Sequence, residues 1–283
     1  MTGRLCLITG GNSGIGLQTA IKLAGMGARL ILTVRSEKKG NEALEKIKKQ
    51  TGKDDTNFMV ADLASFKQIH ELSESLHSRY GHLDVLINNA GLFVTRYQRT
   101  EDGHELQLGI NHLAPFLLTH LLHGLVEKSG QGRIINISSR ANYKGEINFE
   151  DLYYESRYNG LKAYRQSKLA NVLFTFELAG KLKNSSVTVN CLHPGVVSTG
   201  IGNRNNHSWM GWIWRMYKPF MLSEEDGAFC PVKLASDPSM TGISGKYFDY
   251  DGQPVKPNPI AFDQEIRRRL WKESERMTGF SGL

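Results

Sequence analysis

Cysteine is scarce in this 283-residue sequence, and long apolar runs are missing. The three cysteines, Cys6, Cys191 and Cys230, lie far apart among apolar residues, which argues against a disulfide framework or a metal site. We therefore expect reduced thiols and a cytoplasmic protein. No stretch approaches the roughly 20 apolar residues that a membrane-spanning helix needs. Because Met1 stands directly before the first predicted strand, we also expect no signal or transit peptide.

Negative charge is in the minority, but the positive charge is dispersed. The 35 lysines and arginines outnumber the 28 acidic residues, for a formal net charge of +7. This excess favours an anionic partner such as a nucleotide or a membrane surface, or it is only a solvated basic surface. No run of six like charges and no nucleic-acid-binding motif occurs, so we expect no nucleic-acid partner. The length suits one large domain over residues 1–283.

Short apolar strands alternate with amphipathic helices along the chain. Strands are predicted at 4–8, 29–34, 58–61, 83–87, 133–137 and 187–192, and helices at 15–26, 39–50, from an N-cap at Ser65, 106–127 and 266–277. Near-continuous apolar strands between such helices are typical of a parallel sheet covered on both faces. The predicted fold class is therefore α/β, a single-domain Rossmann-type doubly wound parallel sheet with helices on both faces. Its ligand should lie at the carboxyl ends of the strands.

A glycine-rich loop follows the first strand. Gly10, Gly14 and Gly16 allow a tight turn and a close approach to a ligand, and Gly11 is extra to that spacing. The helix that begins near Ser13 would direct its first amides at a phosphate. The G-x-G-x-x-G pattern is not literally present. Taken alone, an ordinary turn between strand and helix is therefore an equally good interpretation.

A second motif, Tyr164 with Lys168, lies on a predicted helix past the middle of the chain. Residues spaced i and i+4 share one helix face, so the ammonium could lower the pKa of the phenol from about 10 and make it a usable acid or base. By itself this spacing is more often an ordinary helix surface. Together, however, the two motifs predict a pyridine-nucleotide oxidoreductase.

These motifs and others in the same order resemble the short-chain dehydrogenase/reductase superfamily. The shared elements are T-G-x-x-x-G-x-G from Thr9, N-N-A-G from Asn88, Asn111, Ser138-Ser139, Tyr164-x-x-x-Lys168, and Pro194-Gly195 followed by Thr199. Residues 151–152, 166–171 and 192–197 look most like the retinol dehydrogenase-like branch. Members of that branch commonly carry a hydrophobic N-terminal anchor, which this sequence lacks. Either an anchor was removed, or this is a relative with another carbonyl substrate.

The resemblance implies four catalytic residues. Tyr164 would be the acid or base, and Lys168 would also bind the nicotinamide ribose. Ser139 would bind the substrate carbonyl in preference to Ser138, because the family's serine is usually the second of such a pair. Strand alternation would point the two serines to opposite faces. Asn111 would hold a water beside Lys168, although an asparagine bonded to a neighbouring strand also fits the pattern.

The end of the second predicted strand favours NADP(H). No carboxylate that would bind the ribose 2′-hydroxyl occurs there before Glu37, whereas Arg35 supplies a cation suited to a 2′-phosphate. The alternative is a solvated arginine. Asp62 resembles an adenine contact and could equally cap the next helix. The implied cofactor-binding residues are Gly10, Asn12, Ser13, Gly14, Ile15, Gly16, Arg35, Ser36, Asp62, Leu63, Asn89, Ala90, Gly91, Tyr164, Lys168, Pro194, Gly195, Val197 and Thr199.

Residues 200–223 are rich in aromatic side chains and methionine, where the family places a variable substrate lid. We expect Trp209 and Trp212, with Ser139 and Tyr164, to contact a lipophilic alcohol, aldehyde or ketone such as a retinoid, isoprenoid, sterol or xenobiotic. The same composition also suits a segment that lies against a membrane surface, or a helix that covers the core or contacts another subunit.

The sequence thus predicts reversible hydride transfer between NADP(H) and a lipophilic carbonyl compound. A catalytically silent NADP(H)-binding regulatory or scaffold protein is the competing hypothesis, since a fold alone does not prove activity. The complete set of Asn111, Ser139, Tyr164 and Lys168 favours catalysis, because a binding module has no need of a proton relay.

Overall fold

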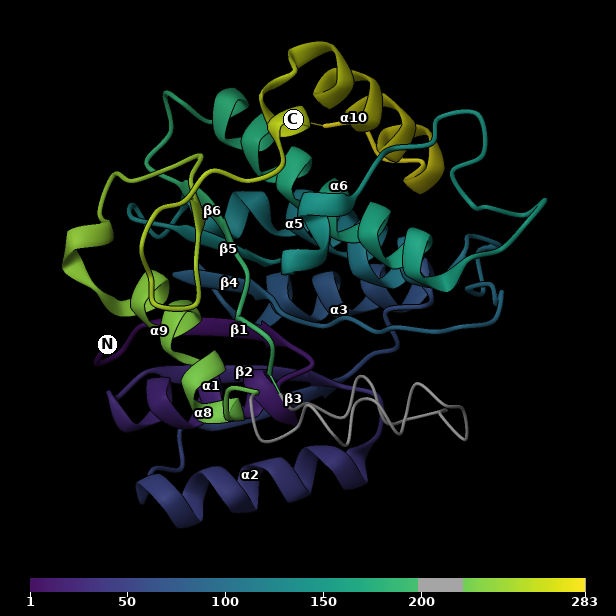
Figure 1. Ribbon diagram of the computed structural model, residues 1–283. Helices are drawn as coiled ribbons and strands as arrows, with labels where there is room; N and C mark the ends of the chain where they lie inside the picture. Colours follow the sequence, from purple (N-terminus) through teal and green to yellow (C-terminus); the bar gives the residue numbers. More distant parts are fainter. Residues whose placement is uncertain (198–220, 283) are drawn as a thin grey trace.

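The computed structural model describes residues 1–197 and 221–282 (Figure 1). In these residues the strands form one parallel sheet of seven, in the order β3-β2-β1-β4-β5-β6-β7. The strands are β1 (Leu5–Thr9), β2 (Arg29–Val34), β3 (Thr56–Val60), β4 (Val85–Asn88), β5 (Arg133–Ile137), β6 (Thr188–Leu192) and β7 (Tyr247–Phe248). The predicted doubly wound parallel sheet is confirmed.

Helices connect the strands and cover the sheet. The α-helices are α1 (Gly14–Gly25), α2 (Glu37–Thr51), α3 (Phe66–Arg79), α4 (Leu106–Leu108), α5 (Ala114–Glu127), α6 (Gly160–Lys181), α8 (Glu224–Gly227), α9 (Phe229–Ser236) and α10 (Gln264–Thr278). Between α4 and α5 lies the π-helix η1 (Gly109–Leu113), and the 3₁₀ helices are η2 (Arg140–Lys144), η5 (Pro238–Met240) and η6 (Pro259–Phe262). The helix predicted at 106–127 is therefore three consecutive elements.

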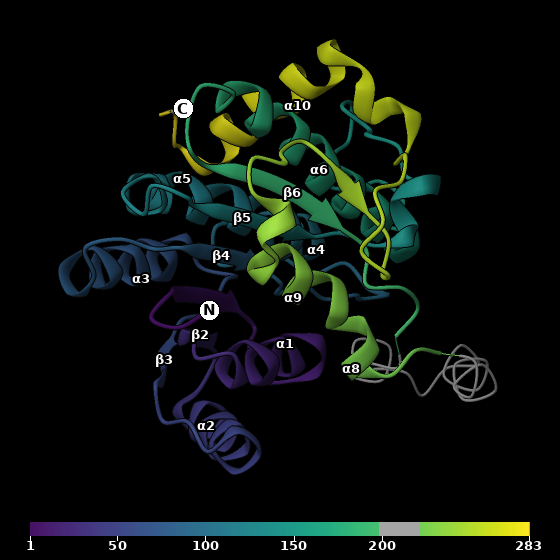
Figure 2. The same cartoon turned by 90° about the vertical axis from the view of Figure 1, so that its left-hand side faces the viewer.

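Alternating side chains along the strands build a core on each face of the sheet. In β1, Leu5 and Leu7 join α3, α5 and α6 in one apolar cluster, whereas Cys6 and Ile8 join α1, α2 and α9 in another. Figure 2 separates these layers, with α5, α6 and α10 above the strands and α1 and α2 below them. Both faces of the strands are therefore buried, which explains why their sequences are continuously apolar.

The strand order reverses between β1 and β4, and the ends of these two strands are tied together. The Thr9 hydroxyl accepts hydrogen bonds from the backbone amides of Asn89 and Ala90, both at 2.9 Å. The Asn89 side chain donates to the Thr9 carbonyl at 2.8 Å. Ligands of open α/β sheets bind at such a reversal, outside the carboxyl ends of the strands. The N-N-A-G motif thus braces the place where a ligand is expected.

The start of α3 confirms Ser65 as the N-cap residue but not Asp62, the alternative role that the sequence left open for that residue. Ser65 stands at the N-cap position of α3, but its side chain makes no capping hydrogen bond. The amide of Phe66 donates instead to Asp102 Oδ2 at 2.8 Å. Asp62 is not the N-cap, and its Oδ1 accepts from the Ala64 amide at 3.0 Å within the preceding turn. A distant carboxylate has replaced the local cap that the sequence pattern predicted.

The C-terminal helix α10 packs on the domain as predicted, with Leu270 and Trp271 buried. Among the described residues, no helix is both long and apolar enough to span a membrane. The same part of the chain contains no cluster of three or more histidine, cysteine, aspartate or glutamate side chains suited to a metal ion.

Candidate active site

The loop between β1 and α1 adopts a backbone that requires glycine at two positions. Gly10 has φ +64° and Gly14 has φ +57°, in the left-handed region that other residues rarely adopt. Ser13 stands at the N-cap of α1 in an extended conformation, and its side chain makes no capping bond. Asn12, Ser13 and Ile15 complete the turn into the helix. The first amides of α1 are therefore directed at the carboxyl edge of the sheet.

The other two glycines of the loop are needed for close packing. A Cβ on Gly16 would lie 2.4 Å from Asn89 Nδ2, so only hydrogen fits between α1 and the N-N-A-G motif. A Cβ on Gly11 would lie 2.6 Å from Leu32 Cδ2. Gly11, extra to the predicted spacing, is thus required where the loop crosses β2.

Tyr164 and Lys168 lie on α6, beside the ends of β4 and β5. Lys168 is 4% exposed, and its Nζ donates to the Ile137 carbonyl at 3.2 Å. The same ammonium lies 5.8 Å from the centroid of the Tyr164 ring. The Ser139 side chain lies close enough to the Tyr164 hydroxyl to lower the pKa of Tyr164, and Phe93 packs edge-on against the Tyr164 ring. The fold therefore brings together a phenol, a hydroxyl and an amine that are up to 29 positions apart in the chain.

Burial dominates the acid–base properties of this pair. It raises the pKa of Tyr164 above its ordinary value, and the hydrogen bond with Ser139 opposes that rise. Burial also lowers the pKa of Lys168 to about 8. The predicted lowering of the Tyr164 pKa by Lys168 is therefore wrong for the protein alone. Removal from water disfavours both the phenolate and the ammonium.

Because the buried ammonium is costly, replacing it should stabilise the fold. We expect Lys168→Met to raise the free energy of unfolding at pH 7 by about 1 to 3 kcal/mol. Between pH 8 and 10.5 the lysine keeps its proton in the unfolded chain but loses it in the folded protein. As the pH falls through this range, the unfolded chain takes up the proton before the folded protein does, so the stability of the wild type falls. The variant has no such group, so its stability should not show this change. Thermal melting against pH measures this. Loss of the lysine does not leave the Ile137 carbonyl without a partner, because the side-chain amide of Asn171 also donates to it, at 3.3 Å.

The exposed Lys162 on the same helix supplies the control for this measurement. Lys162→Met removes a lysine that remains in water, so it should leave the pH profile of stability unchanged. If Lys168→Met instead lowered the melting temperature at pH 7, the buried amine would be stabilising and our assignment of its cost would be contradicted.

Asn111 lies in the π-helix η1 and braces the segment after β4. Its Oδ1 accepts from the Leu92 amide at 2.8 Å, and its Nδ2 donates to the Leu92 carbonyl at 3.0 Å and to Ser167 Oγ at 3.0 Å. A Cβ on Gly91 would lie 3.1 Å from Lys168 Nζ and 3.2 Å from Asn111 Oδ1. These bonds tie Asn111 to the segment that follows β4 and to helix α6, and its predicted role beside a water at Lys168 stays a prediction.

Ser138 and Ser139 end β5 with different surroundings. Ser138 is buried, and its Oγ donates to the Lys168 carbonyl at 2.6 Å. Ser139 is partly exposed, and its Oγ accepts from the Ala141 amide at 3.2 Å. As strand alternation predicted, one serine faces helix α6, and the other faces the open edge of the sheet beside Tyr164.

The predicted adenosine contacts lie at the ends of the neighbouring strands. Arg35 follows β2 and is exposed, and Ser36 stands at the N-cap of α2 without a capping side-chain bond. Asp62 is partly exposed after β3, next to the buried Leu63. The Gly10 amide donates to the Thr33 carbonyl at 3.2 Å, which places the glycine loop beside the end of β2. These residues therefore share one edge with the glycine loop.

Pro194 and Gly195 form a turn after β6, with Gly195 at φ +81°. Val197 packs in an apolar cluster with Ile15 of α1 and Ala228, so this turn closes against the glycine loop. Thr199, Trp209 and Trp212 lie outside the described residues.

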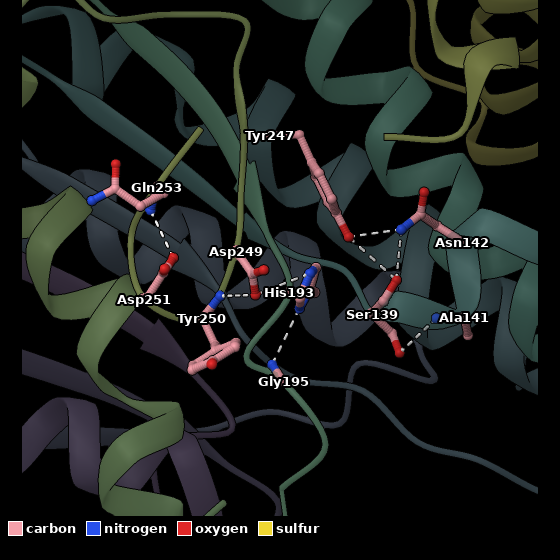
Figure 3. Close-up of polar contacts among 10 residues, drawn as sticks. All are labelled: Ser139, Ala141, Asn142, His193, Gly195, Tyr247, Asp249, Tyr250, Asp251 and Gln253. Atoms are coloured by element: carbon pink, nitrogen blue, oxygen red, sulfur yellow. Dashed lines mark hydrogen bonds and ion pairs between the residues drawn. The ribbon is translucent and has the colours of Figure 1, made fainter. Parts of the chain in front are cut away.

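The sequence did not predict the side chains that fix the position of Ser139 and of the Pro194-Gly195 turn. The Tyr247 hydroxyl accepts from Asn142 Nδ2 at 2.7 Å and donates to the Ser139 carbonyl at 3.4 Å (Figure 3). The imidazole of His193 lies 3.3 Å from Asp249. Only His193 carried a signal, because it directly precedes Pro194-Gly195.

Comparison with known proteins identifies the family to which this chain belongs. The model of the family described as "short chain dehydrogenase" matches residues 4–209. This chain belongs to the short-chain dehydrogenase family. It is 41% identical to mouse retinol dehydrogenase 14, over 99% of this chain and 87% of that protein. It is 42% identical to human retinol dehydrogenase 13, over 98% of this chain and 85% of that protein. The family contains oxidoreductases that interconvert alcohols and carbonyl compounds.

Two solved structures share the architecture of this chain. An uncharacterised protein from Mycobacterium paratuberculosis matches with a TM-score of 0.80 and 32% identity, covering 99% of this chain and 95% of that one. A gluconate 5-dehydrogenase from Beutenbergia cavernae, described as putative and NAD(P)-dependent and solved with bound NADP, matches with a TM-score of 0.71 and 27% identity, covering 89% and 96%. This short-chain dehydrogenase thus shares its fold with both of these proteins.

Proposed function

We propose that this protein is an NADP(H)-dependent enzyme that interconverts a lipophilic alcohol with its aldehyde or ketone. The observation that carries the proposal is the meeting of Tyr164, Ser139 and Lys168 at the strand ends beside the glycine loop. The Tyr164 phenol and the Ser139 hydroxyl are both partly exposed and lie close to each other, so together they can hold one oxygen atom of a substrate.

The backbone around this group fits a dinucleotide. Gly10 and Gly14 take left-handed conformations, which lets the backbone turn tightly. Gly91 leaves open a space beside Lys168 and Asn111 that the Cβ of any other residue would fill. We infer that the cofactor lies along the glycine loop and the ends of β2, β3, β4 and β6, held by the residues that the sequence predicts to bind it. When bound, it supplies or accepts the hydride.

The residues of this chain manage the proton and the substrate oxygen. In the reducing direction, the Tyr164 hydroxyl gives its proton to the carbonyl oxygen as the carbonyl carbon receives the hydride, which yields the alcohol. The Ser139 hydroxyl donates a hydrogen bond to the same oxygen. Asn111 is a positioning residue, because it acts through the segment at Leu92 and through Ser167.

The preference for NADP(H) rests on Arg35. Its exposed guanidinium follows β2, where a carboxylate would otherwise select the unphosphorylated cofactor. A planar guanidinium binds phosphate through paired hydrogen bonds. The structurally similar protein from Beutenbergia cavernae was solved with bound NADP, which supports this choice.

The substrate class rests on composition and on the relatives. Two of the similar proteins are named retinol dehydrogenases. Residues 200–223 carry Trp209, Trp212 and other bulky apolar side chains that suit a lipophilic substrate. The same segment suits peripheral contact of a cytoplasmic protein with a membrane surface, and liposome co-sedimentation tests that role separately.

The two serines give a paired prediction. Ser139→Ala should lower turnover by about 100-fold while NADPH binding is retained, because one hydrogen bond to the reacting oxygen is lost. Ser138→Ala should mainly lower stability, by about 1 kcal/mol, because it removes a buried hydrogen bond to α6. Steady-state kinetics and thermal melting separate these effects. The reverse pattern would identify Ser138 as the residue that binds the carbonyl.

Turnover on a panel of carbonyl compounds tests the proposal as a whole. Wild-type protein should oxidise NADPH in the presence of long or ring-bearing aldehydes and ketones, and more slowly in the presence of small ones. With the same carbonyl compounds, NADH should be oxidised more slowly still than NADPH. If NADPH binds and no carbonyl or alcohol on the panel turns over, the silent regulatory or scaffold alternative is favoured. If neither cofactor binds, both hypotheses are wrong.

A further inference from the structure

His193, directly after β6, is held from two sides. Its imidazole is 3% exposed, and Nε2 lies 3.3 Å from Asp249 Oδ1. On the other side, the Gly195 amide donates to Nδ1 at 3.3 Å. Figure 3 shows the ring between these two partners. Because an amide only donates, Nδ1 must be unprotonated, so the neutral ring carries its hydrogen on Nε2 and gives it to the carboxylate.

The carboxylate of Asp249 is itself fixed. Its Oδ1 also accepts from the Tyr250 amide at 2.6 Å, and its backbone amide donates to the Gln253 carbonyl at 2.9 Å. The His193 amide donates to the Phe248 carbonyl at 3.1 Å. Backbone and side chain of His193 are thus both tied to β7 and the turn that follows it, which leaves the ring little freedom to rotate.

The turn that His193 contacts borders the candidate active site. The Ser138 amide donates to the Leu192 carbonyl at 2.7 Å. The turn therefore begins next to Ser139, the neighbouring serine that we propose to bind the substrate carbonyl. A Cβ on Gly195 would lie 2.4 Å from Leu222 Cδ1, and Val197 packs with Ile15 at the start of α1, directly after the glycine loop. The turn therefore joins the substrate side of the site to the loop that would hold the cofactor phosphates.

We propose that His193 is a positioning residue that holds the Pro194-Gly195 turn in the shape that receives the cofactor beside Ser139. This proposal rests on the proposed NADP(H)-dependent function. Asp249 fixes the tautomer, and the acceptor Nδ1 orients the Gly195 amide. Protonation of the ring releases the turn, because Nδ1 then carries a hydrogen and no longer accepts.

Several charged or titratable groups face the ring. They are Asp249 and Asp251 after β7, Tyr247 of β7, and Arg140 and Tyr143 of η2. Burial lowers the pKa of His193, Arg140 lowers it further, and the two aspartates oppose this. The ring is therefore neutral at pH 7, and the turn is released only in acid, below the ordinary titration range of histidine.

Two substitutions separate the two nitrogen atoms. His193→Asn places an amide oxygen near the position of Nδ1 and so keeps an acceptor for Gly195. His193→Gln reaches toward Asp249 but leaves the Gly195 amide without its acceptor. Fluorescence titration with NADPH at pH 7 should show that His193→Gln binds NADPH about threefold to tenfold more weakly than the wild type. The dissociation constant of His193→Asn should stay within about twofold of the wild-type value.

A second titration series at decreasing pH tests the release. The affinity of the wild type should fall in acid relative to that of His193→Asn, which has no imidazole to protonate. Titration of the 2′-phosphate affects both proteins equally, so it cancels in this ratio. The ratio also decides the question if His193→Gln fails to fold, as judged by thermal melting.

The outcomes separate the two proposals. If the wild type binds NADPH but His193→Gln binds equally well and the acid ratio stays constant, His193 does not position the turn, and the proposed function is untouched. If the wild type binds no NADPH at any pH, the proposed function and this inference are both wrong.

Discussion

Tyr164→Phe is expected to lower turnover by about 100- to 10,000-fold, the usual contribution of a positioned acid or base. The ring remains packed edge-on against Phe93, so the site should keep its shape. Only the hydroxyl that lies near Ser139 is lost. Steady-state kinetics with the best carbonyl substrate measures the loss, and NADPH titration should give nearly the wild-type dissociation constant.

Tyr80→Phe is the matched control for this loss, because Tyr80 is partly buried at the end of α3 and packs against the core. It should retain full turnover. If Tyr164→Phe kept a large share of wild-type activity, or if both variants fell equally, another group would be transferring the proton.

Arg35→Asp should reverse the cofactor preference. The change removes a charge-assisted contact to the 2′-phosphate and adds a repelling carboxylate, so NADPH binding should weaken by about 10- to 100-fold. The same carboxylate offers the ribose hydroxyl of NADH an acceptor, so NADH binding should improve. Dissociation constants for both cofactors, measured by fluorescence titration, check both directions.

Arg29→Asp at the amino end of β2 makes the same charge change on an exposed arginine of the same strand. It should leave the preference unchanged. Equal effects of the two substitutions would indicate a general charge effect, and an unchanged preference in Arg35→Asp would exclude Arg35 as the selecting residue.

Much of the fold was predictable because it depends on local patterns. The bounds of β2 and β5 were predicted residue for residue, since both strands are continuously apolar and buried. The strand β7 was not predicted. It has only two residues, and it exists because Tyr247 and Phe248 pair with β6 far earlier in the chain. Long-range pairing of this kind leaves no periodic signal.

The site shows the same division. The motif residues that the structure describes, identified by spacing and resemblance, lie near one another where the predicted strand ends converge. The electrostatics of these residues did not follow from spacing, because the partial burial that raises the pKa of Tyr164 is produced by the whole fold. The packing role of Gly11 against Leu32 and the π-helical turn at Asn111 likewise depend on neighbouring elements.

Transfer of deuterium from NADPH labelled on the nicotinamide ring to a lipophilic aldehyde tests the central claim most directly. With the wild type, mass spectrometry of the product should show the alcohol with one deuterium on the carbon that carried the aldehyde oxygen. With Tyr164→Phe, the same incubation should yield almost none, although NADPH is still bound. Absence of labelled alcohol with the wild type across the panel, while NADPH is bound, would contradict the assignment of this site to carbonyl reduction.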